Sequence, residues 1–245
     1  RVCPFSLVPL RSMPTPHLKR TDVAVVVLAA GLGTRMKSDT AKVLHELMGR
    51  AMILYVVDAA KAVAGEHMVL VVGHQADRVR SIVSSQAAVQ YAFQKEQLGT
   101  GHAVQAAMPL LEERVTDIVI LCGDVPLLTP CTIAALVDDH RREQRDITLL
   151  GVDVEKPYGY GRLILNADRV VSKIVEETDA DDEQKRIRTV NSGIYCVRKA
   201  ALMDTIFRIR PANRQKELYL TDIIEIGNHR GQTVGHEGTF DRLGG

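Results

Sequence analysis

The sequence has 245 residues, of which 46% are apolar and 25% charged, and its formal net charge is +1. A chain of this length can bury a substantial core as one large domain or two small ones, so we expect a globular protein. The near-neutral charge provides no field to hold nucleic acid or an anionic membrane, and with no Trp and 4% aromatic residues few side chains are suited to base stacking. We therefore expect neither a nucleic-acid-binding nor a membrane-binding protein.

The cysteines and the N-terminal residues indicate the cellular compartment in which the protein is expected. The 4 cysteines form no C-x-x-C pair, so neither a zinc knuckle nor a disulfide framework is indicated, and we expect reduced thiols in a cytoplasmic protein. No apolar run approaches the roughly 18 residues of a membrane span. Residues 1–22 are rich in proline, which interrupts any signal-peptide core, and we interpret them as a disordered, partly artificial tail.

The most informative pattern lies between Val23 and Leu44. Its apolar run, Val25 to Leu28, lacks alternation, which is typical of a strand buried on both faces of a parallel sheet. Small residues and two glycines follow and allow a sharp turn close to a ligand. The cations Arg35 and Lys42 come next. Such a loop at the carboxyl end of a first strand suits a phosphate chain, because backbone N–H groups and positive charge converge there.

Three interpretations of this loop compete. A Walker A loop requires Lys-Ser or Lys-Thr after the last glycine, and neither follows Gly33; a dinucleotide fingerprint requires a third glycine, where Met36 stands. A glycine-rich turn without a ligand is the simplest alternative. The pattern L-x-x-G-x-G-x-R-M, with Lys42 six residues later, resembles the signature of the sugar-phosphate nucleotidylyltransferases, whose loop surrounds a nucleoside triphosphate. That resemblance implies nucleotide contacts from Leu28, Ala29, Ala30, Gly31, Gly33 and Thr34.

Helical and strand patterns alternate along the next part of the chain. We expect helices at 52–64 and 77–85, the latter with Asp77 as a possible N-cap, and strands at 68–72 and 89–93. Alternation at this length implies right-handed βαβ crossovers and an α/β fold with a Rossmann-like, mostly parallel sheet flanked by helices. Further strands are expected at 118–122, 147–154, 161–165 and 170–175, and further helices at 103–112, 130–143 and 200–209.

A polar run, QKEQLGTGHA, follows the third strand. In structural terms it is a loop and a helix capped by Thr100 or Gly101. Its two amides, Gln94 and Gln97, are also suited to reading a base edge, since each offers a donor and an acceptor. Within the family, the run is most similar to that of the N-acetylglucosamine-1-phosphate uridylyltransferases. The resemblance implies that Gln94 reads the base, that Gln97 lies in the nucleotide site, and that Gly99 and Thr100 contact the pyrimidine.

The next motif is a carboxylate, Asp124, directly after a buried strand. Open α/β sheets bind ligands at this edge, although Asp124 could instead cap the turn at Pro126. Mg²⁺ takes one or two carboxylates together with waters and substrate phosphates, which suits a single Asp facing a triphosphate. The resemblance makes Asp124 the magnesium ligand and places Cys122 and Gly123 in the nucleotide site. Cys122 stands where the family has an aromatic residue.

From about residue 151 the composition shifts to strands and loops. We therefore divide the expected domain, 23–245, into a nucleotide-binding half at about 23–150 and a sugar-binding half at about 151–245. By resemblance, the backbone of Gly161 approaches the acetamido sugar, and Glu176 and Asn191 hydrogen-bond its hydroxyl groups; each residue alone would be ordinary. Thr221 or Asp222 is expected to start a helix, and for Asp222 we favour capping over metal binding.

The resemblance covers roughly residues 23–245. It implies transfer of a uridylyl group from UTP to N-acetylglucosamine 1-phosphate, giving UDP-N-acetylglucosamine and pyrophosphate for peptidoglycan precursor synthesis in the cell wall, with Mg²⁺ as cofactor. Arg35 and Lys42 would be the catalytic cations. Ala41 stands where the family has a proline. Two alternatives stay open: a related nucleotidylyltransferase that uses CTP, GTP or dTTP, and a nucleotide-sugar-binding module without catalysis.

The family also has features that this sequence does not carry. Hexapeptide repeats are not found, so the C-terminal β-helix acetyltransferase domain of bifunctional relatives is not expected. Full-length relatives form trimers largely through those repeats, which leaves the oligomeric state of this chain open. A second magnesium ligand, an Asn, is expected a few residues beyond Gly245.

Overall fold

The computed structural model describes residues 20–31, 33 and 38–238. Of the predicted tail, residues 1–19 thus lie outside the described residues, whereas its last residues pack on the body of the protein. The Arg20 backbone N–H donates a hydrogen bond to the Val63 carbonyl at 2.8 Å, and the Arg20 side chain pairs with Asp138 at 2.6 Å.

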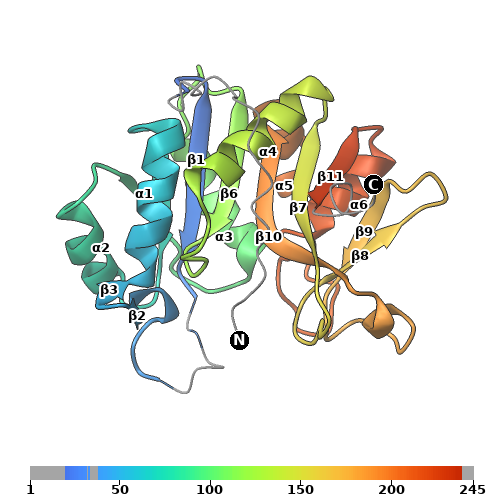
Figure 1. The fold of residues 1–245 in the computed structure, drawn as a ribbon, viewed down its shortest axis with the longest axis horizontal. Helices are drawn as coiled ribbons and strands as arrows, with labels where there is room; N and C mark the ends of the chain where they lie inside the picture. The colour runs from blue at the N-terminus through green and yellow to red at the C-terminus, as the bar shows by residue number, and fades with distance from the viewer. Residues whose placement is uncertain (1–19, 32, 34–37, 239–245) are drawn as a thin grey trace, which may run out of the picture.

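A nine-stranded sheet forms the centre of the fold (Figure 1). Its main order is β11-β7-β10-β6-β1-β4-β5, and β8 joins β10 to β9. The pairs β1–β4, β1–β6, β4–β5 and β7–β11 are parallel, whereas β10 is antiparallel to β6, β7 and β8, and β8 is antiparallel to β9. The strands are β1 (Val23–Ala29), β4 (Met68–Val72), β5 (Gln90–Phe93), β6 (Asp117–Cys122), β7 (Ile147–Asp153), β8 (Arg162–Leu165), β9 (Val171–Val175), β10 (Thr189–Arg198) and β11 (Val234–Gly238). A separate two-stranded hairpin consists of β2 (Glu46–Leu47) and β3 (Arg50–Ala51).

Helices cover both faces of the sheet. The side chains of Val25 and Val27 pack in one core cluster with α1, α2 and α4, and those of Ala24 and Val26 pack in a second cluster with α3, α5 and α6. Because both faces of β1 are buried, its sequence is apolar throughout. The helices are α1 (Met52–Ala64), α2 (Ala76–Ser84), α3 (Thr100–Ala107), α4 (Pro130–Arg142), α5 (Lys199–Ile206) and α6 (Asp222–His229).

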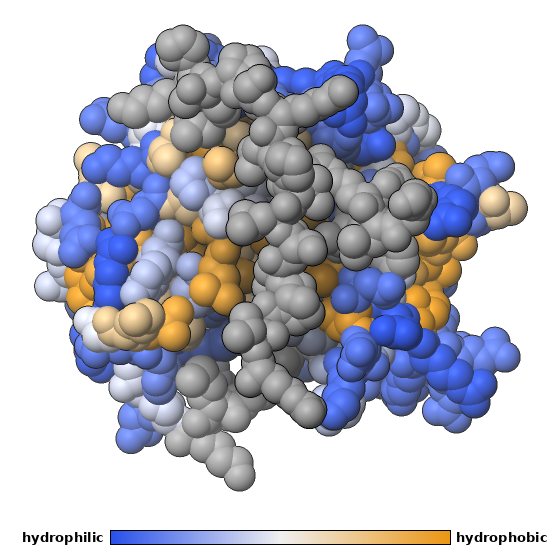
Figure 2. Space-filling model, viewed as in Figure 1, coloured by the Kyte–Doolittle hydropathy of each residue, from blue (hydrophilic) through white to orange (hydrophobic). Residues whose placement is uncertain are grey.

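The surface of the protein carries both hydrophilic and hydrophobic residues (Figure 2). On the face drawn in Figure 2, hydrophilic residues lie mainly around the periphery, with hydrophobic residues between them. None of the helices in the described ranges is long and apolar enough to cross a membrane.

The expected α/β fold with a mostly parallel sheet is confirmed. Helix α1 and strand β4 have the predicted bounds, because their apolar periodicity is strong. Two strands of the nine-stranded sheet were not predicted, and neither was the short hairpin of β2 and β3. β10 is ten residues long and β11 is five; an Asn-Ser-Gly sequence inside β10 resembles a turn, and β11 carries a polar His236-Glu237 pair.

The caps predicted at Asp77, at Thr100 or Gly101 and at Asp222 are wrong, but a helix does start at Thr221 or Asp222 as expected, since α6 begins at Asp222 with Thr221 as its N-cap residue. Helix α3 begins at Thr100 after Gly99, and the Thr100 hydroxyl accepts a hydrogen bond from Leu220 N at 3.0 Å rather than capping its own helix. Asp77 lies in the first turn of α2. Asp222 is the first residue of α6, where burial, followed by the charges of Glu225, Glu176 and Asp179, raises the pKa of its carboxyl to about 6.

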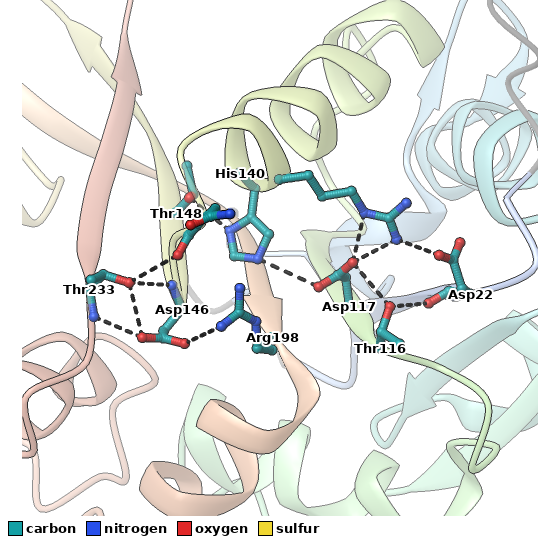
Figure 3. Close-up of polar contacts among 10 residues, drawn as sticks. Asp22, Thr116, Asp117, His140, Asp146, Thr148, Arg198 and Thr233 are labelled. Atoms are coloured by element: carbon teal, nitrogen blue, oxygen red, sulfur yellow. Dashed lines mark hydrogen bonds and ion pairs between the residues drawn. The ribbon is translucent and has the colours of Figure 1, made fainter.

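A polar network closes the amino edge of the sheet (Figure 3). The Arg141 guanidinium at the end of α4 donates two hydrogen bonds to Asp117 Oδ2, at 2.8 and 2.6 Å, and one to Asp22 at 2.9 Å. The buried His140 ring lies 3.6 Å from Asp117 on one side and bonds the Thr148 hydroxyl at 2.8 Å on the other. These contacts attach α4 to the first residues of β6 and to the residue that precedes β1.

The charge of Asp117 is stabilised in this network. Burial alone raises the pKa of its carboxyl, but the hydrogen bonds of His140 and Arg141 and the positive charge of Arg141 outweigh burial and lower the pKa to about 2 from an ordinary value of 3.8. Because the folded-state pKa is depressed, the charged carboxylate stabilises the fold above about pH 4. That stabilisation is lost as the pH falls from 4 towards 2.

We expect Asp117→Asn to lower the free energy of unfolding at pH 7 by about 2 kcal/mol, because the charge-assisted bonds to Arg141 are lost. The difference from the wild type should fall to about 1 kcal/mol or less near pH 2.5 and vanish only below about pH 2. Urea unfolding followed at both pH values measures it. In the control, Asp58→Asn removes an exposed ion pair with Arg50 (2.7 Å) and should cost about 0.5 kcal/mol or less. An equal loss for Asp117→Asn at both pH values would contradict this account.

Candidate functional site

A cavity of about 370 Å³ opens at the carboxyl ends of β1 and β6, the edge opposite the network of Asp117. It brings together three motifs that are far apart in the sequence: the loop after β1, the polar run before α3 and the carboxylate after β6. Of the residues predicted for the nucleotide and metal sites, those that line it are Leu28, Ala29, Ala30, Gly31, Gly33, Lys42, Gln94, Gln97, Gly99, Thr100, Cys122 and Asp124. Thr34 and Arg35 lie outside the described residues.

Lys42 and Asp124 form an ion pair inside this cavity. The side chain of Lys42 is 46% exposed and that of Asp124 is 24% exposed, so both charges remain accessible to a ligand from the cavity. Gly33 brings the loop against Lys42: its φ is +64°, and a Cβ added there would lie 2.9 Å from Lys42 Cβ. The close approach and the left-handed backbone both favour glycine at position 33.

Ala41 has a backbone conformation that a proline could adopt, and a hydrogen bond to Gln75 holds it in place. Its φ of −52° falls in the range that a proline ring imposes. Its backbone N–H donates a hydrogen bond to Gln75 Oε1 at 3.2 Å, and Gln75 Nε2 bonds the Asp39 carbonyl. The side-chain amide of Gln75 therefore holds the segment that leads into Lys42, a bond that a proline at 41 could not make.

The side-chain amides of Gln94 and Gln97 each donate a hydrogen bond to a backbone carbonyl of the same polar run. Gln94 is 4% exposed, and its Nε2 donates to the Gly99 carbonyl at 3.0 Å, which fixes the turn before α3. Gln97 Nε2 bonds the Gln94 carbonyl at 3.4 Å. Both residues line the cavity, so their side-chain amides lie beside the space that a ligand would fill.

Glu217 lines the cavity, and the sequence analysis did not find it. Its segment docks on the turn at Gly99: Leu218 N–H donates to the Leu98 carbonyl, and Gly101 N–H donates to the Leu218 carbonyl, each at 2.7 Å. Gly99 has a φ of +111°, and a Cβ there would lie 2.6 Å from the Leu218 oxygen. No sequence spacing signals this contact, because the segments are more than 100 residues apart.

Cys122 forms a wall of the cavity beside Asp124. Its thiol donates to the Gly193 carbonyl at 3.6 Å. Burial, followed by the negative charge of Asp124, raises the pKa of the thiol to about 12, so it is protonated and not a nucleophile at neutral pH. Cys131 and Cys196 are also free.

The residues predicted for the sugar site lie close to one another, but not in this cavity. Asn191 N–H donates to the Gly161 carbonyl at 2.9 Å, and a Cβ on Gly161 would lie 3.3 Å from the Glu176 carboxyl group. Glu176 lines a second cavity of about 190 Å³ with Tyr158, Gly159, Glu177, Thr178 and Gln215. Gly123 also lies outside the lining of the first cavity; its N–H bonds the Leu28 carbonyl at 2.9 Å.

Within the described ranges, no group of three or more His, Cys, Asp or Glu side chains is placed to hold a metal ion. A structural zinc-type site is thus not found there. A site with a single protein carboxylate, such as Asp124, is the type that depends on ligand oxygens for the rest of its coordination.

Comparison with known proteins is consistent with this geometry. Residues 25–191 match the family described as MobA-like NTP transferase domain. A protein named "Bifunctional protein GlmU" from Geobacter metallireducens is 47% identical over 210 residues, which are 86% of this chain and 44% of the relative. The protein of the same name from Heliobacterium modesticaldum is 46% identical over 216 residues, 88% of this chain and 46% of the relative. The chain thus spans less than half the length of these relatives.

A solved structure supports the fold. A Bacillus anthracis protein assigned as a glucose-1-phosphate thymidylyltransferase superposes with a TM-score of 0.73 at 19% identity, covering 89% of this chain and 87% of the other. The match to the family covers more than half of the sequence and includes β1, β6 and the cavity motifs between them. This chain belongs to the MobA-like NTP transferase domain family.

Proposed function

We propose that this chain transfers a uridylyl group from UTP to N-acetylglucosamine 1-phosphate, releasing pyrophosphate and UDP-N-acetylglucosamine. The observation that carries the proposal is the cavity in which the loop after β1, the turn before α3 and the pair Lys42 and Asp124 meet. Relatives named GlmU, 43–47% identical over 82–88% of the chain, support the choice of substrates.

In this reaction an oxygen of the sugar phosphate attacks the α-phosphorus of UTP in line with the departing pyrophosphate. The attacking oxygen is already anionic, so no general base is needed. Catalysis then depends on positioning and on neutralising negative charge that moves to the leaving group. Lys42 can supply a positive charge at the phosphate chain, and Arg35, from the same loop, is proposed to act with it.

Magnesium is proposed as the cofactor, with Asp124 as its protein ligand. The residues fit this ion: Asp124 offers a hard oxygen donor, its side chain is partly exposed in the cavity, and its present partner is a cation, Lys42, so the position attracts positive charge. Bound there, Mg²⁺ would supply charge neutralisation between the two phosphate-bearing substrates. The Lys42 ammonium would then be free to turn from Asp124 to the phosphate chain.

The acceptor sugar is proposed to bind at Gly161, Glu176 and Asn191. The three residues are neighbours in the structure, and Cys122 lies between Asp124 and Gly193, next to this group. A site that hydrogen-bonds hydroxyl groups discriminates strongly against sugars that lack them. A supply of peptidoglycan precursor in the cytoplasm is the cellular role that this activity implies, and the division into nucleotide- and sugar-binding halves near residue 150 belongs to the same proposal.

Pyrophosphate release tests the proposal directly. UTP, CTP, GTP and dTTP are each combined with N-acetylglucosamine 1-phosphate and with glucose 1-phosphate in the presence of Mg²⁺. We expect release with UTP and the N-acetylated sugar. Release with another pair only would identify a different nucleotidylyltransferase, and binding of UDP-N-acetylglucosamine without any release would identify a non-catalytic module.

Lys42→Ala should lower turnover by about a hundredfold or more, because it removes a positive charge from the phosphate chain as negative charge develops. Initial rates of pyrophosphate release at saturating substrates measure the effect. Lys61→Ala, on the exposed side of α1, is the matched control and should leave turnover unchanged. Near-normal turnover of Lys42→Ala would reject the assigned role.

Asp124→Asn should abolish magnesium-dependent turnover while the fold is retained, because the amide keeps the size of the side chain but loses the charge that attracts the cation. Thermal melting and activity are compared in the same preparation, and Mn²⁺ binding is followed by electron paramagnetic resonance. A variant that melts like the wild type, fails to bind Mn²⁺ and shows no turnover fits the proposal. Retained Mn²⁺ binding would place the metal elsewhere.

A further inference from the structure

Strand β10 is interrupted beside the proposed sugar site. Its register with β7 shifts between Asn191, which is opposite Gly151, and Tyr195, which is opposite Leu149. Four positions on β10 thus span two on β7, so two extra residues bulge out of the ladder. Gly193, in the middle of the bulge, has a φ of +79°, which a residue with a side chain rarely adopts.

Both the oxygen and the nitrogen of the Asn191 side-chain amide form hydrogen bonds within this bulge. Gly193 N–H donates to Asn191 Oδ1 at 3.0 Å, and Asn191 Nδ2 donates to the Tyr195 hydroxyl oxygen at 2.7 Å. A backbone N–H can only donate, so the amide oxygen must face Gly193 and the amide nitrogen must face Tyr195. The Gly193 N–H therefore selects one orientation of the amide, and the tyrosine hydroxyl holds the amide nitrogen in that orientation.

The two bonds leave part of the hydrogen-bonding capacity of the Asn191 amide unused. They use one of its two N–H groups and one of its two oxygen lone pairs. One N–H and one lone pair of the amide remain, a donor and an acceptor on the same side chain. This combination matches a sugar hydroxyl, which both donates and accepts.

The hydroxyl of Tyr195 lies among apolar side chains, and burying it there costs free energy of desolvation. Tyr195 is 1% exposed and packs in the core cluster of α3, α5 and α6. Burial, followed by the negative charge of Glu176, raises the pKa of the hydroxyl well above its ordinary value, so it is neutral at any working pH. A phenylalanine would fill the same space without burying a polar group, so the hydroxyl is best explained by its bond to Asn191.

The bulge is also in contact with the wall of the main cavity. A Cβ on Gly193 would lie 2.9 Å from Cys122 Sγ, and the Cys122 thiol bonds the Gly193 carbonyl. Cys122 lines the cavity beside Asp124. The amide that Tyr195 orients thus lies two residues from the point at which β10 meets the proposed reaction site.

We propose that Tyr195 is a positioning residue for the sugar substrate: its buried hydroxyl holds the Asn191 amide in the one orientation that presents a donor and an acceptor to a sugar hydroxyl. This inference rests on the proposed function and deepens it. Tyr195 itself touches no substrate, and its effect passes through Asn191.

Tyr195→Phe keeps the ring and removes the hydroxyl. We expect the KM for N-acetylglucosamine 1-phosphate to rise about three- to tenfold, as for the loss of one hydrogen bond, while the KM for UTP stays unchanged. Initial rates with each substrate varied in turn measure both constants. The matched control, Tyr55→Phe, removes a hydroxyl that bonds the Leu47 carbonyl at 2.8 Å on the opposite face of the sheet, and both KM values should stay at wild-type levels.

A double-mutant cycle separates positioning from a general structural effect. If Tyr195 acts through the amide, Tyr195→Phe should change the KM for the sugar phosphate by less than about twofold in an Asn191→Ala background. Equal effects in both backgrounds, a parallel rise in the KM for UTP, or an unchanged KM with only a lower melting temperature would each overturn the inference. A wild-type protein that releases no pyrophosphate from any nucleotide would instead overturn the proposed function. In that case, weaker binding of UDP-N-acetylglucosamine, but not of UDP, to Tyr195→Phe would still support the positioning role.

Discussion

The burial of β1 on both faces is the constraint from which the architecture follows. Its alternate side chains enter two separate core clusters, so helices must pack on each side of the sheet. Helices on both faces require crossover connections, which make the neighbouring pairs β1–β4 and β1–β6 parallel. Parallel strands all end at one edge, and the loops after β1 and β6 therefore meet there. The cavity that Lys42 and Asp124 line is a direct result of this arrangement.

The two edges of the sheet use ion pairs for different purposes. At the amino edge, Asp117 is 6% exposed and receives two hydrogen bonds from Arg141, so this pair adds to stability. At the carboxyl edge, Lys42 and Asp124 share a cavity and are partly open to solvent. An exposed pair contributes little to stability and can be separated by a ligand at small cost. Stability and the proposed chemistry are thus located at opposite ends of the same strands.

Much of the fold could be predicted from the sequence, because the signals involved are local. The apolar run of β1 and the periodicity of α1 each identify an element without reference to any other part of the chain. β10 was missed because its bulge places Asn191, Ser192 and Gly193 together, which resembles a turn, and the strand is stabilised by its neighbours rather than by its own pattern.

In the candidate site, too, local motifs could be predicted from the sequence, whereas contacts between distant segments could not. The loop glycines, Lys42 and Asp124 belong to contiguous motifs and were found, and the structure places them in one cavity. Glu217 and Tyr195 were not found, since their roles come from tertiary contacts with the turn at Gly99 and with Asn191. The roles assigned to the sugar-site residues remain predictions, because the structure shows that they are neighbours and not what they bind.

The contact of Leu218 with the turn at Gly99 has a mechanical consequence. Two backbone hydrogen bonds join Leu218 to Leu98 and Gly101, and Thr221, three residues later, donates from its hydroxyl to the Glu176 carboxylate at 3.3 Å. One short stretch of chain thus bridges the region assigned to the base and the region assigned to the sugar. Because only residues 218–221 connect these contacts, the distance between the two regions is limited by the length of this short stretch of chain.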